Sequence, residues 1–187
     1  MQIEQIEGES PDTAEARRET RSGRVIAVCY SPELINKVGK EAHDQGPITR
    51  WGIPGDHHYG ETRMSKRQRR PVPNNRPISL VGVEAGNAAC ERLGITPIPP
   101  GGLGENLLLE GLGDLSDLRQ GDRIEVLSSD GTQKVVFEVN GQNPPCAHLR
   151  IYHRLMPKEL MNKRGVICTV LQEGAVASGD VVRIVPA

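Results

Sequence analysis

The sequence predicts a mainly β domain, a closed barrel or another compact β-rich fold, with a few short helices. Short runs rich in valine, isoleucine and leucine recur along the chain, and turns that contain glycine separate them. Long helices do not alternate regularly with these runs, which argues against a doubly wound sheet. Aromatic residues make up only 3% of the chain, so aliphatic side chains must fill most of the core.

The chain divides into a polar N-terminal extension, residues 1–22, and one domain, residues 23–187. A chain of 187 residues is long enough for one continuous core with modest appendages. The Ser-Pro-Asp sequence at 10–12 is suited to begin a short helix over 14–20, and a frayed tail is the alternative. The net charge of −1 argues against a general polyanion-binding protein, but it leaves room for a local basic patch.

The first half of the domain combines two strands and a helix with a long irregular stretch. A β-rich run over 24–30 predicts the first strand, which a Ser-Pro pair ends. Residues 33–77 show little periodicity and many glycines, prolines and charges, as is typical of functional loops. Residues 78–81 predict a strand that leads into a helix over 83–93, and a glycine and a proline beyond it stop this helix.

An Asp-Gly pair at 130–131 predicts a β-hairpin in the second half of the domain. Such pairs favour hairpin turns because glycine and aspartate tolerate a positive φ. The two strands of the hairpin are expected over 123–127 and 134–139, and a short strand over 106–109 precedes them.

The last part of the domain combines a helical segment with two strands. The helical segment is expected over about 147–162, with an interruption or a restart at Pro157. The apolar runs 165–172 and 180–185 are expected to form a closing strand pair.

The four cysteines lie far apart and form no Cys-X-X-Cys pair, which argues against a zinc site or a disulfide framework. Cys29, Cys90 and Cys168 lie in apolar patterns and are expected to be small buried side chains. The chain has no apolar run of about 18 residues and begins with an acidic segment, so we expect neither a membrane span nor a secretory signal. A cytoplasmic protein with reduced thiols fits these observations best.

Cys146 differs from the other cysteines because two prolines precede it at the junction between a predicted strand and a predicted helix. The prolines fix the backbone that leads to the thiol. If a helix begins at Ala147, its free N–H groups and its dipole favour a thiolate at Cys146. A thiolate is a nucleophile and a soft metal ligand, so Cys146 is the candidate catalytic residue. The alternative is a buried structural cysteine, and His148 as a base for the thiol stays open.

The loop 52–60 gathers glycines, a carboxylate and two imidazoles. Its glycines allow a ligand to approach the backbone closely, and Asp56 can accept hydrogen bonds from a ligand or orient a neighbour. His57 and His58 invite a metal site. Adjacent side chains on an extended chain point in opposite directions, however, which favours polar packing within the loop.

The loop 101–106 is a second glycine-rich segment with polar residues at its end, Glu105 and Asn106. It lacks the spacing and the lysine of a P-loop, and the dinucleotide fingerprint is incomplete. Its polar side chains either face a pocket at the start of a strand or satisfy local backbone groups.

The segment 63–70 is the one concentrated basic run of the chain. It is suited to contact nucleic acid or to bind a small phosphorylated anion through guanidinium groups. The commonest alternative is a solvated loop. No aromatic residues interleave with the arginines, which argues against binding of single-stranded nucleic acid.

Several short segments carry a resemblance to a known family: Gly52-Ile53-Pro54-Gly55-Asp56, Ile78-Ser79-Leu80, Gly104-Glu105-Asn106-Leu107, Gly121-Asp122, Pro145-Cys146 and the ending from Arg164-Gly165-Val166 to Gly179-Asp180. In this order, across residues 23 to 186, they resemble the MOSC family, which is named for the C-terminal domain of molybdenum cofactor sulfurases. The resemblance implies a closed β-barrel of the pyruvate-kinase type with a pocket for a pyranopterin molybdenum cofactor.

The same resemblance implies that Cys146 binds the molybdenum or carries sulfur. The candidate cofactor-binding residues are Asp56, His57, Arg63, Arg76, Gly104, Glu105 and Asn106. The phosphate of the cofactor is expected to bind Arg63, Lys66 or Arg76, or the backbone N–H groups of the glycine loops.

Three functions follow from these expectations. The first is molybdenum-dependent reduction of N-hydroxylated compounds, with electrons from a separate donor protein. The second is a sulfur carrier with a persulfide on Cys146, supplied by a cysteine desulfurase. The third is a binding module in which residues 63–70 engage RNA or an acidic partner, and the near-zero net charge argues against the nucleic acid.

Overall fold

The structure is a computed structural model that describes residues 20–65 and 67–187. Most of the predicted extension and nearly all of the predicted helix over 14–20 lie outside the described residues. The first strand begins at Arg21, two residues before the expected start of the domain.

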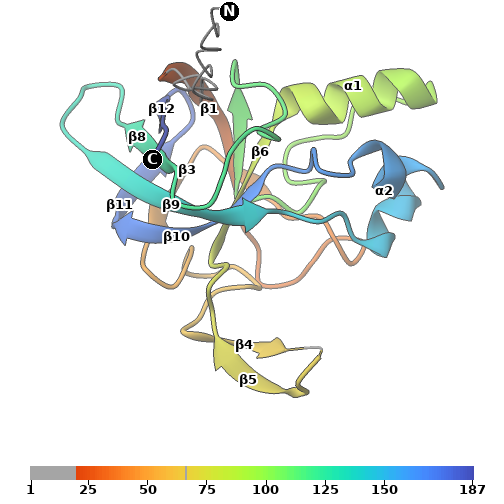
Figure 1. The fold of residues 1–187 in the computed structure, drawn as a ribbon, viewed down its shortest axis with the longest axis horizontal. Coiled ribbons are helices and arrows are strands. Elements are labelled where there is room, and N and C mark those ends of the chain that lie inside the picture. Colours follow the sequence, from red (N-terminus) through yellow and green to blue (C-terminus); the bar gives the residue numbers. More distant parts are fainter. Residues whose placement is uncertain (1–19, 66) are drawn as a thin grey trace, which may run out of the picture.

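Seven strands within the described residues close into a β-barrel (Figure 1). All neighbouring pairs are antiparallel except β6 with β7, which is parallel. The predicted closed, mainly β fold is therefore confirmed. Around the ring the strands follow in the order β1 (Arg21–Cys29), β12 (Val181–Val185), β8 (Arg123–Leu127), β9 (Lys134–Gln142), β10 (Val166–Gln172), β6 (Ile78–Gly82) and β7 (Leu107–Glu110), which returns to β1.

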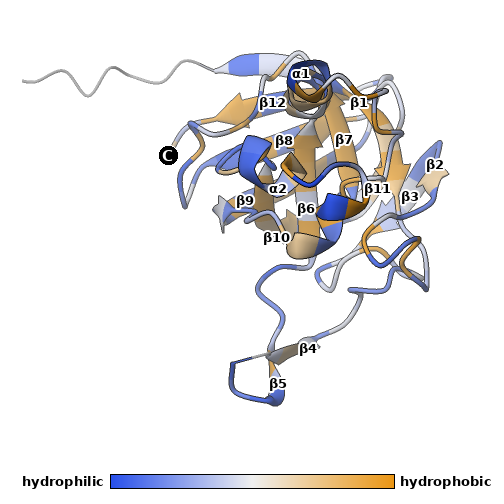
Figure 2. Cartoon of the chain, turned by 90° about the vertical axis from the view of Figure 1, so that its right-hand side faces the viewer, coloured by the Kyte–Doolittle hydropathy of each residue, from blue (hydrophilic) through white to orange (hydrophobic). Residues whose placement is uncertain are grey.

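Aliphatic side chains fill the interior of the barrel, as the low aromatic content requires. Figure 2 shows that hydrophobic residues dominate several of the barrel strands. Strands β8 and β12 show the expected alternation, in which every second residue is buried. Phe137 on β9 is the largest fully buried side chain within the described residues. Burial of this continuous apolar cluster is the main term that stabilises the fold.

Helix α1 (Val83–Leu93) has the bounds that the sequence predicts. It ends at Gly94, whose φ of 64° lies in the left-handed region and whose N–H bonds back to Glu91 and Cys90 carbonyls. The buried face of α1 packs on the outside of the barrel in a second apolar cluster, which also contains residues of the later helices. These helices therefore cover the same side of the barrel (Figure 1).

The predicted helical segment over 147–162 consists of two short helices. The first is η1 (Ala147–Ile151), a 3-10 helix, and the second is α2 (Met156–Glu159). The break occurs before Pro157, because proline lacks an N–H and fits only the first turn of a helix. No helix in the described part of the chain is long and apolar enough to cross a bilayer.

The predicted hairpin around 130–131 is confirmed. Strand β8 has the expected bounds, and β9 extends three residues beyond the expected end, to Gln142. Asp130 accepts hydrogen bonds from Ser128 Oγ at 2.6 Å and from Thr132 N at 3.0 Å, which stabilises the turn.

The predicted closing strand pair is wrong in its partners. Both strands exist, but β10 lies between β9 and β6, whereas β12 lies between β8 and β1. The chain between them forms β11 (Gly174–Ala177), which pairs with β3 (Gln45–Ile48). Closure of the barrel decides this pairing, because β12 must join β8 to the first strand.

The irregular stretch 33–77 contains four short strands. Besides β3 these are β2 (Ala42–His43), which pairs with β1, and the hairpin of β4 (Thr62–Ser65) and β5 (Arg70–Pro73). The β4–β5 hairpin protrudes from the barrel at the lower side of the view (Figure 1). These four strands are too short, and in part too rich in proline, for the periodicity of the sequence to reveal them.

Candidate functional site

Cys146 lies in the turn that connects β9 to η1. Its backbone is extended, with φ −99° and ψ 159°, and its carbonyl accepts a hydrogen bond from Leu149 N at 3.2 Å. The thiol is partly buried against the outer apolar cluster. Because η1 is a short 3-10 helix, the dipole that the sequence led us to expect contributes little at this sulfur.

The other three cysteines are free and buried, as predicted. Burial raises the pKa values of Cys29 and Cys168, which keeps both thiols protonated. Cys146 is therefore the cysteine that a ligand can reach.

Arg164 places a positive charge beside Cys146. The side chain is 8% exposed, and its donors are satisfied by carbonyls: Nε and Nη2 bond to Leu103 O at 3.2 and 2.5 Å, and Nη1 bonds to Pro144 O at 3.0 Å. Burial lowers the pKa of Arg164, whereas the charge of Cys146, the charge of Glu105 and a hydrogen bond with Cys146 raise it. Through the bond to Pro144 O, the guanidinium lies beside the turn that carries Cys146, where its positive charge can attract an anion.

Glu105 closes the loop 101–106 on itself. Its carboxylate is 1% exposed and accepts the N–H groups of Gly101 at 2.7 Å and Leu103 at 3.1 Å. Burial raises the pKa of Glu105, while backbone hydrogen bonds and the charges of Lys40 and Arg164 lower it. Glu105 therefore satisfies local backbone groups, which is the second of the two roles that the sequence left open. A contact with a cofactor stays a prediction.

Gly104 and its neighbours let this loop pack tightly under Arg164. Gly104 has a φ of 80°, and a Cβ atom there would lie 2.7 Å from the carbonyl oxygen of Val38. Only glycine combines this conformation with this approach. Two residues earlier in the same loop, the Gly102 carbonyl accepts a hydrogen bond from Tyr152 Oη at 2.8 Å, which ties the loop to the segment that follows Cys146.

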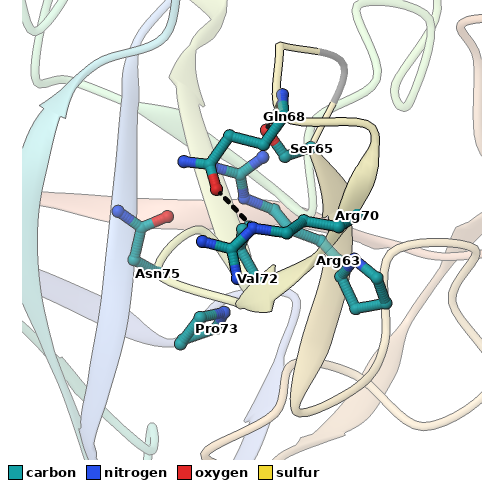
Figure 3. A pocket seen from close by; sticks show the side chains of 8 residues that line it. Arg63, Ser65, Gln68, Arg70, Val72, Pro73 and Asn75 are labelled. Atoms are coloured by element: carbon teal, nitrogen blue, oxygen red, sulfur yellow. Dashed lines mark hydrogen bonds between the residues drawn. The ribbon is translucent and has the colours of Figure 1, made fainter.

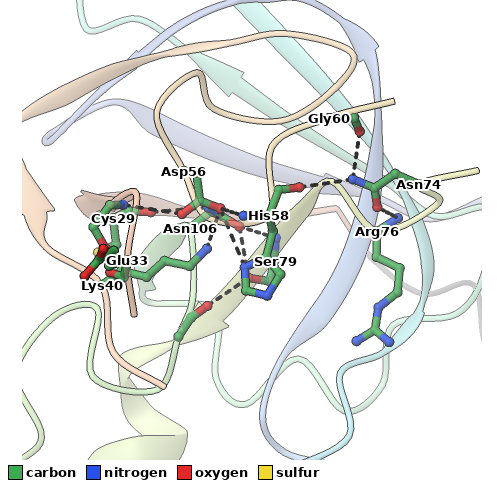
Figure 4. A network of polar contacts seen from close by, with 12 residues as sticks. Cys29, Glu33, Lys40, Asp56, His58, Gly60, Asn74, Arg76, Ser79 and Asn106 are labelled. Atoms are coloured by element: carbon green, nitrogen blue, oxygen red, sulfur yellow. Dashed lines mark hydrogen bonds and ion pairs between the residues drawn. The ribbon is translucent and has the colours of Figure 1, made fainter. Parts of the chain in front are cut away.

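Asp56 forms a buried ion pair with Lys40 beneath the loop 52–60 (Figure 4). Lys40 Nζ lies 2.9 Å from Asp56 Oδ2, and both side chains are 1% exposed. Asp56 also accepts hydrogen bonds from His58 N at 3.2 Å and from Ser31 N at 3.4 Å. Burial lowers the pKa of Lys40, and the charge and hydrogen bond of Asp56 oppose this effect. The carboxylate thus orients its own loop.

Asn106 connects three segments at the same buried layer (Figure 4). Its Nδ2 donates to Cys29 O and to Asp56 Oδ2, both at 3.3 Å, and its Oδ1 accepts Ser79 N at 3.1 Å. These bonds hold β1, the loop 52–60 and β6 together. The contribution of Asn106 to cofactor binding stays a prediction.

His57 and His58 lie on the surface of this loop. Their rings are 5.0 Å apart in an edge-to-face arrangement, and His57 N donates to Ser31 O at 2.7 Å. No group of three histidine, cysteine, aspartate or glutamate side chains that could hold a metal ion occurs among residues 20–65 and 67–187. The His57 contact with a cofactor stays a prediction.

The acid sensitivity of the fold should depend on His58. Its side chain is 54% exposed. Desolvation and the positive charges of Lys40, His57 and Arg76 nevertheless lower the pKa of His58 from 6.5 to about 4, whereas the charge of Asp56 raises it. Between these two values the unfolded chain binds a proton more readily than the folded chain, so stability falls as the pH decreases through this window.

The His58→Gln variant should therefore lose less stability than the parent protein between neutral pH and about pH 4.5. Denaturant unfolding across this range checks the difference, and His148→Gln, at an exposed histidine, is the control. Parallel pH profiles for the parent protein and His58→Gln would contradict this assignment.

Arg63 and Arg76 add positive charge to the side of the molecule that carries Arg164. Arg76 follows β5, and Figure 4 shows its side chain directed away from the Lys40–Asp56 pair. Partial burial lowers the pKa of Arg76 most, and the charges of Arg63 and Arg164 lower it further. The Nε atom of Arg63 is buried without a hydrogen-bond partner. The charges of Arg63, Arg76 and Arg164 thus act on one another, and this side of the molecule attracts anions.

The structure thus separates the predicted site residues into two groups. Asp56, Glu105 and Asn106 are buried and bonded within the fold, whereas Cys146 and the arginines are accessible to different degrees. Sequence reasoning missed Lys40 and did not assign a role to Arg164. The one signal for Arg164 was its place before a glycine at the start of a strand, which does not reveal that its side chain reaches the Cys146 turn.

Comparison with known proteins assigns this chain to a family. The MOSC domain matches residues 54–183. A curated relative, the YuaD protein of Bacillus subtilis (strain 168), whose name refers to metal-sulfur cluster biosynthesis, is 31% identical over 151 residues, or 71% of this chain and 76% of the relative.

Solved structures agree with this match. The crystal structure of Bacillus subtilis YuaD superimposes with a TM-score of 0.78 at 25% identity and covers 90% of this chain and 98% of that chain. The crystal structure of YiiM from Geobacillus stearothermophilus has the same fold, with a TM-score of 0.61 at 22% identity over 88% of this chain and 75% of that chain. The protein therefore belongs to the MOSC domain family.

Proposed function

We propose that this protein binds a pyranopterin molybdenum cofactor, with Cys146 as the protein ligand to the metal, and that it supports molybdenum-dependent reduction of N-hydroxylated compounds. The observation that carries the proposal is the hydrogen bond from the buried guanidinium of Arg164 to Pro144 O, which places a positive charge at the turn that carries Cys146. Among the described residues Arg164 has carbonyl partners and no carboxylate in an ion pair. Its positive charge is therefore available to a thiolate.

The donor set of the chain fits such a cofactor. A metal that is already chelated by cofactor sulfur needs few ligands from the protein, and a thiolate is a compatible soft ligand. The phosphate of the cofactor needs cationic partners, and Arg76 offers an exposed guanidinium on the side of Arg164. The unpartnered Nε of Arg63 is a second donor without a use inside the fold.

The chain's own residues would position the reaction. When bound, the molybdenum centre supplies two electrons to the N–O bond, and two protons complete the conversion of the hydroxylamine to an amine and water. Cys146 would hold the centre, and Arg164, which fixes the turn through Pro144 O, would stabilise the charge of the thiolate. The electrons come from a separate donor protein, which is the partner that this function requires.

The molybdenum content of the purified protein tests the proposal. We expect stoichiometric molybdenum in protein from a host that makes the cofactor, and loss of the metal in Cys146→Ser. Cys90→Ala is the matched control, because Cys90 is buried in α1 and cannot reach a ligand. Arg164→Lys should retain more metal than Arg164→Met, since lysine keeps the charge. Equal molybdenum in the parent protein and Cys146→Ser would refute ligation by Cys146.

A sulfur carrier is the second candidate, and the name of the YuaD relative, which refers to metal-sulfur cluster biosynthesis, favours it. A persulfide on Cys146 is an anion at neutral pH and would be stabilised by Arg164 in the same way. A cysteine desulfurase would then be the partner. Mass spectrometry of the same preparations decides between the two: one labile added sulfur on Cys146 without molybdenum supports the carrier and contradicts the reductase.

A further inference from the structure

One face of the β4–β5 hairpin gathers polar side chains whose hydrogen-bond donors are only partly used within the described residues. Arg63 pairs with Val72, and Ser65 pairs with Arg70 across the two strands. Side chains two positions apart on a strand share a face, so all four lie on the same face of the hairpin. Two arginines at diagonal positions of this kind lie about 7–8 Å apart, with their Cβ atoms somewhat closer, so both guanidinium groups can reach one ligand.

This face carries uncompensated positive charge. No carboxylate within the described residues forms an ion pair with Arg63 or Arg70. Arg70 donates from Nε to Gln68 Oε1 at 3.0 Å, which orients its guanidinium, and Arg63 Nε is buried without a partner. The positive charge of Arg63 also lowers the pKa of Arg76. Two like charges held side by side repel each other unless an anion lies between them.

A hollow of about 460 Å³ lies on this face (Figure 3). Ser65 Oγ accepts Gln68 N at 3.1 Å, so its O–H is free to donate, and the Asn75 side chain makes no hydrogen bond within the described residues. Prolines and Val72 form the apolar part of the wall. The hollow is open to solvent, and it holds more space than an inorganic ion alone needs.

We propose that this hollow binds a small organic molecule through its phosphate monoester. A phosphate offers three acceptor oxygens, and Arg63, Arg70, Ser65 and Asn75 together provide donors for all three. A carboxylate, with two oxygens, would use fewer of them. The apolar wall then contacts the organic part of the ligand.

The site does not depend on molybdenum at Cys146. Asn140 Nδ2 donates to Asn75 O at 2.7 Å and anchors the hairpin base to β9, while the remaining lining residues belong to the hairpin itself. Cys146→Ser should therefore bind the phosphate probe as the parent protein does. This independence separates a failure of the hairpin site from a failure of the proposed function.

Isothermal titration of the full chain with phenyl phosphate tests the proposal, with inorganic phosphate, benzoate and phenol as comparison probes. We expect saturable binding of phenyl phosphate, weaker binding of inorganic phosphate and benzoate, and none of phenol. Arg63→Gln and Arg70→Gln should each raise the Kd for phenyl phosphate about tenfold or more, since each removes charged hydrogen-bond donors. Arg63→Lys should recover only part of this loss.

Arg67→Gln is the matched control, because Arg67 is exposed on the same hairpin and does not line the hollow. An equal weakening by Arg67→Gln would overturn the site in favour of a diffuse charge effect, and equal affinity for benzoate would overturn the phosphate assignment. The molybdenum content of Arg63→Gln and Arg70→Gln identifies the source of the phosphate. Unchanged metal indicates a separate ligand, and parallel loss of metal and of phenyl phosphate binding indicates the phosphate of the cofactor.

Discussion

The Lys40→Met variant is expected to lose about 3–5 kcal/mol of unfolding free energy. Lys40 and Asp56 are both 1% exposed and lie 2.9 Å apart, so methionine would fill the space of the lysine and leave the carboxylate charged and buried. Asp56 keeps two backbone donors, from Ser31 and His58, but these do not neutralise its charge. An unpaired buried charge is among the few single changes with effects of this size.

Denaturant unfolding of Lys40→Met beside Lys37→Met measures this effect. Lys37 is exposed in the same loop, so its replacement should change stability by less than about 0.5 kcal/mol. In the double variant Lys40→Met with Asp56→Asn, the loss should be smaller than the sum of the two single losses, because no uncompensated charge remains. If Lys40→Met and Lys37→Met unfold alike, the buried ion pair does not contribute as the structure indicates.

The second large effect is expected at Gly165, where alanine should destabilise the fold by about 2–5 kcal/mol. A Cβ atom there would lie 1.9 Å from Leu80 O, and the φ of 73° disfavours any side chain. Gly165 stands between Arg164 and β10, and its carbonyl accepts Asn143 N at 2.8 Å. The substitution should therefore also displace the turn that carries Cys146.

Gly94→Ala separates the two contributions. Gly94 has a similar φ of 64°, but a Cβ atom there would meet nothing within 4 Å. The Gly94→Ala variant should therefore lose only the unfolding free energy that a positive φ costs alanine, about 1–2 kcal/mol. Thermal or denaturant unfolding of both variants gives the steric contribution at Gly165 by difference. Equal losses would mean that β6 moves away from β10 with little resistance.

Elements with a strong local signal were predictable from the sequence. Helix α1 has a left-handed glycine at its C-terminus, and the β8–β9 hairpin has an Asp-Gly turn. In both cases the residues that decide the structure are neighbours in the chain. The short strands in 33–77 escaped prediction because they consist of a few residues that pair over long distances.

The pairing partners of the last two long strands, β10 and β12, are decided by the closure of the whole barrel. The runs 165–172 and 180–185 are both strands, and nothing in their composition shows that they pair with β9 and β6 on the one hand and with β8 and β1 on the other. Antiparallel neighbours in sequence pair often, but a closed barrel requires its last strand to meet its first.

The sequence by itself determined the β-rich class, the hairpin, helix α1, the family resemblance and the distinction between Cys146 and three buried cysteines, because patterns among neighbouring residues carry these properties. Only the tertiary structure decided the surroundings of Cys146. It placed Arg164 beside the turn that carries Cys146 and buried Lys40 against Asp56. It also directed the side chains of Glu105 and Asn106 to hydrogen-bond partners within the protein. Such contacts join residues far apart in the chain, and they arise when the barrel closes and removes these groups from water.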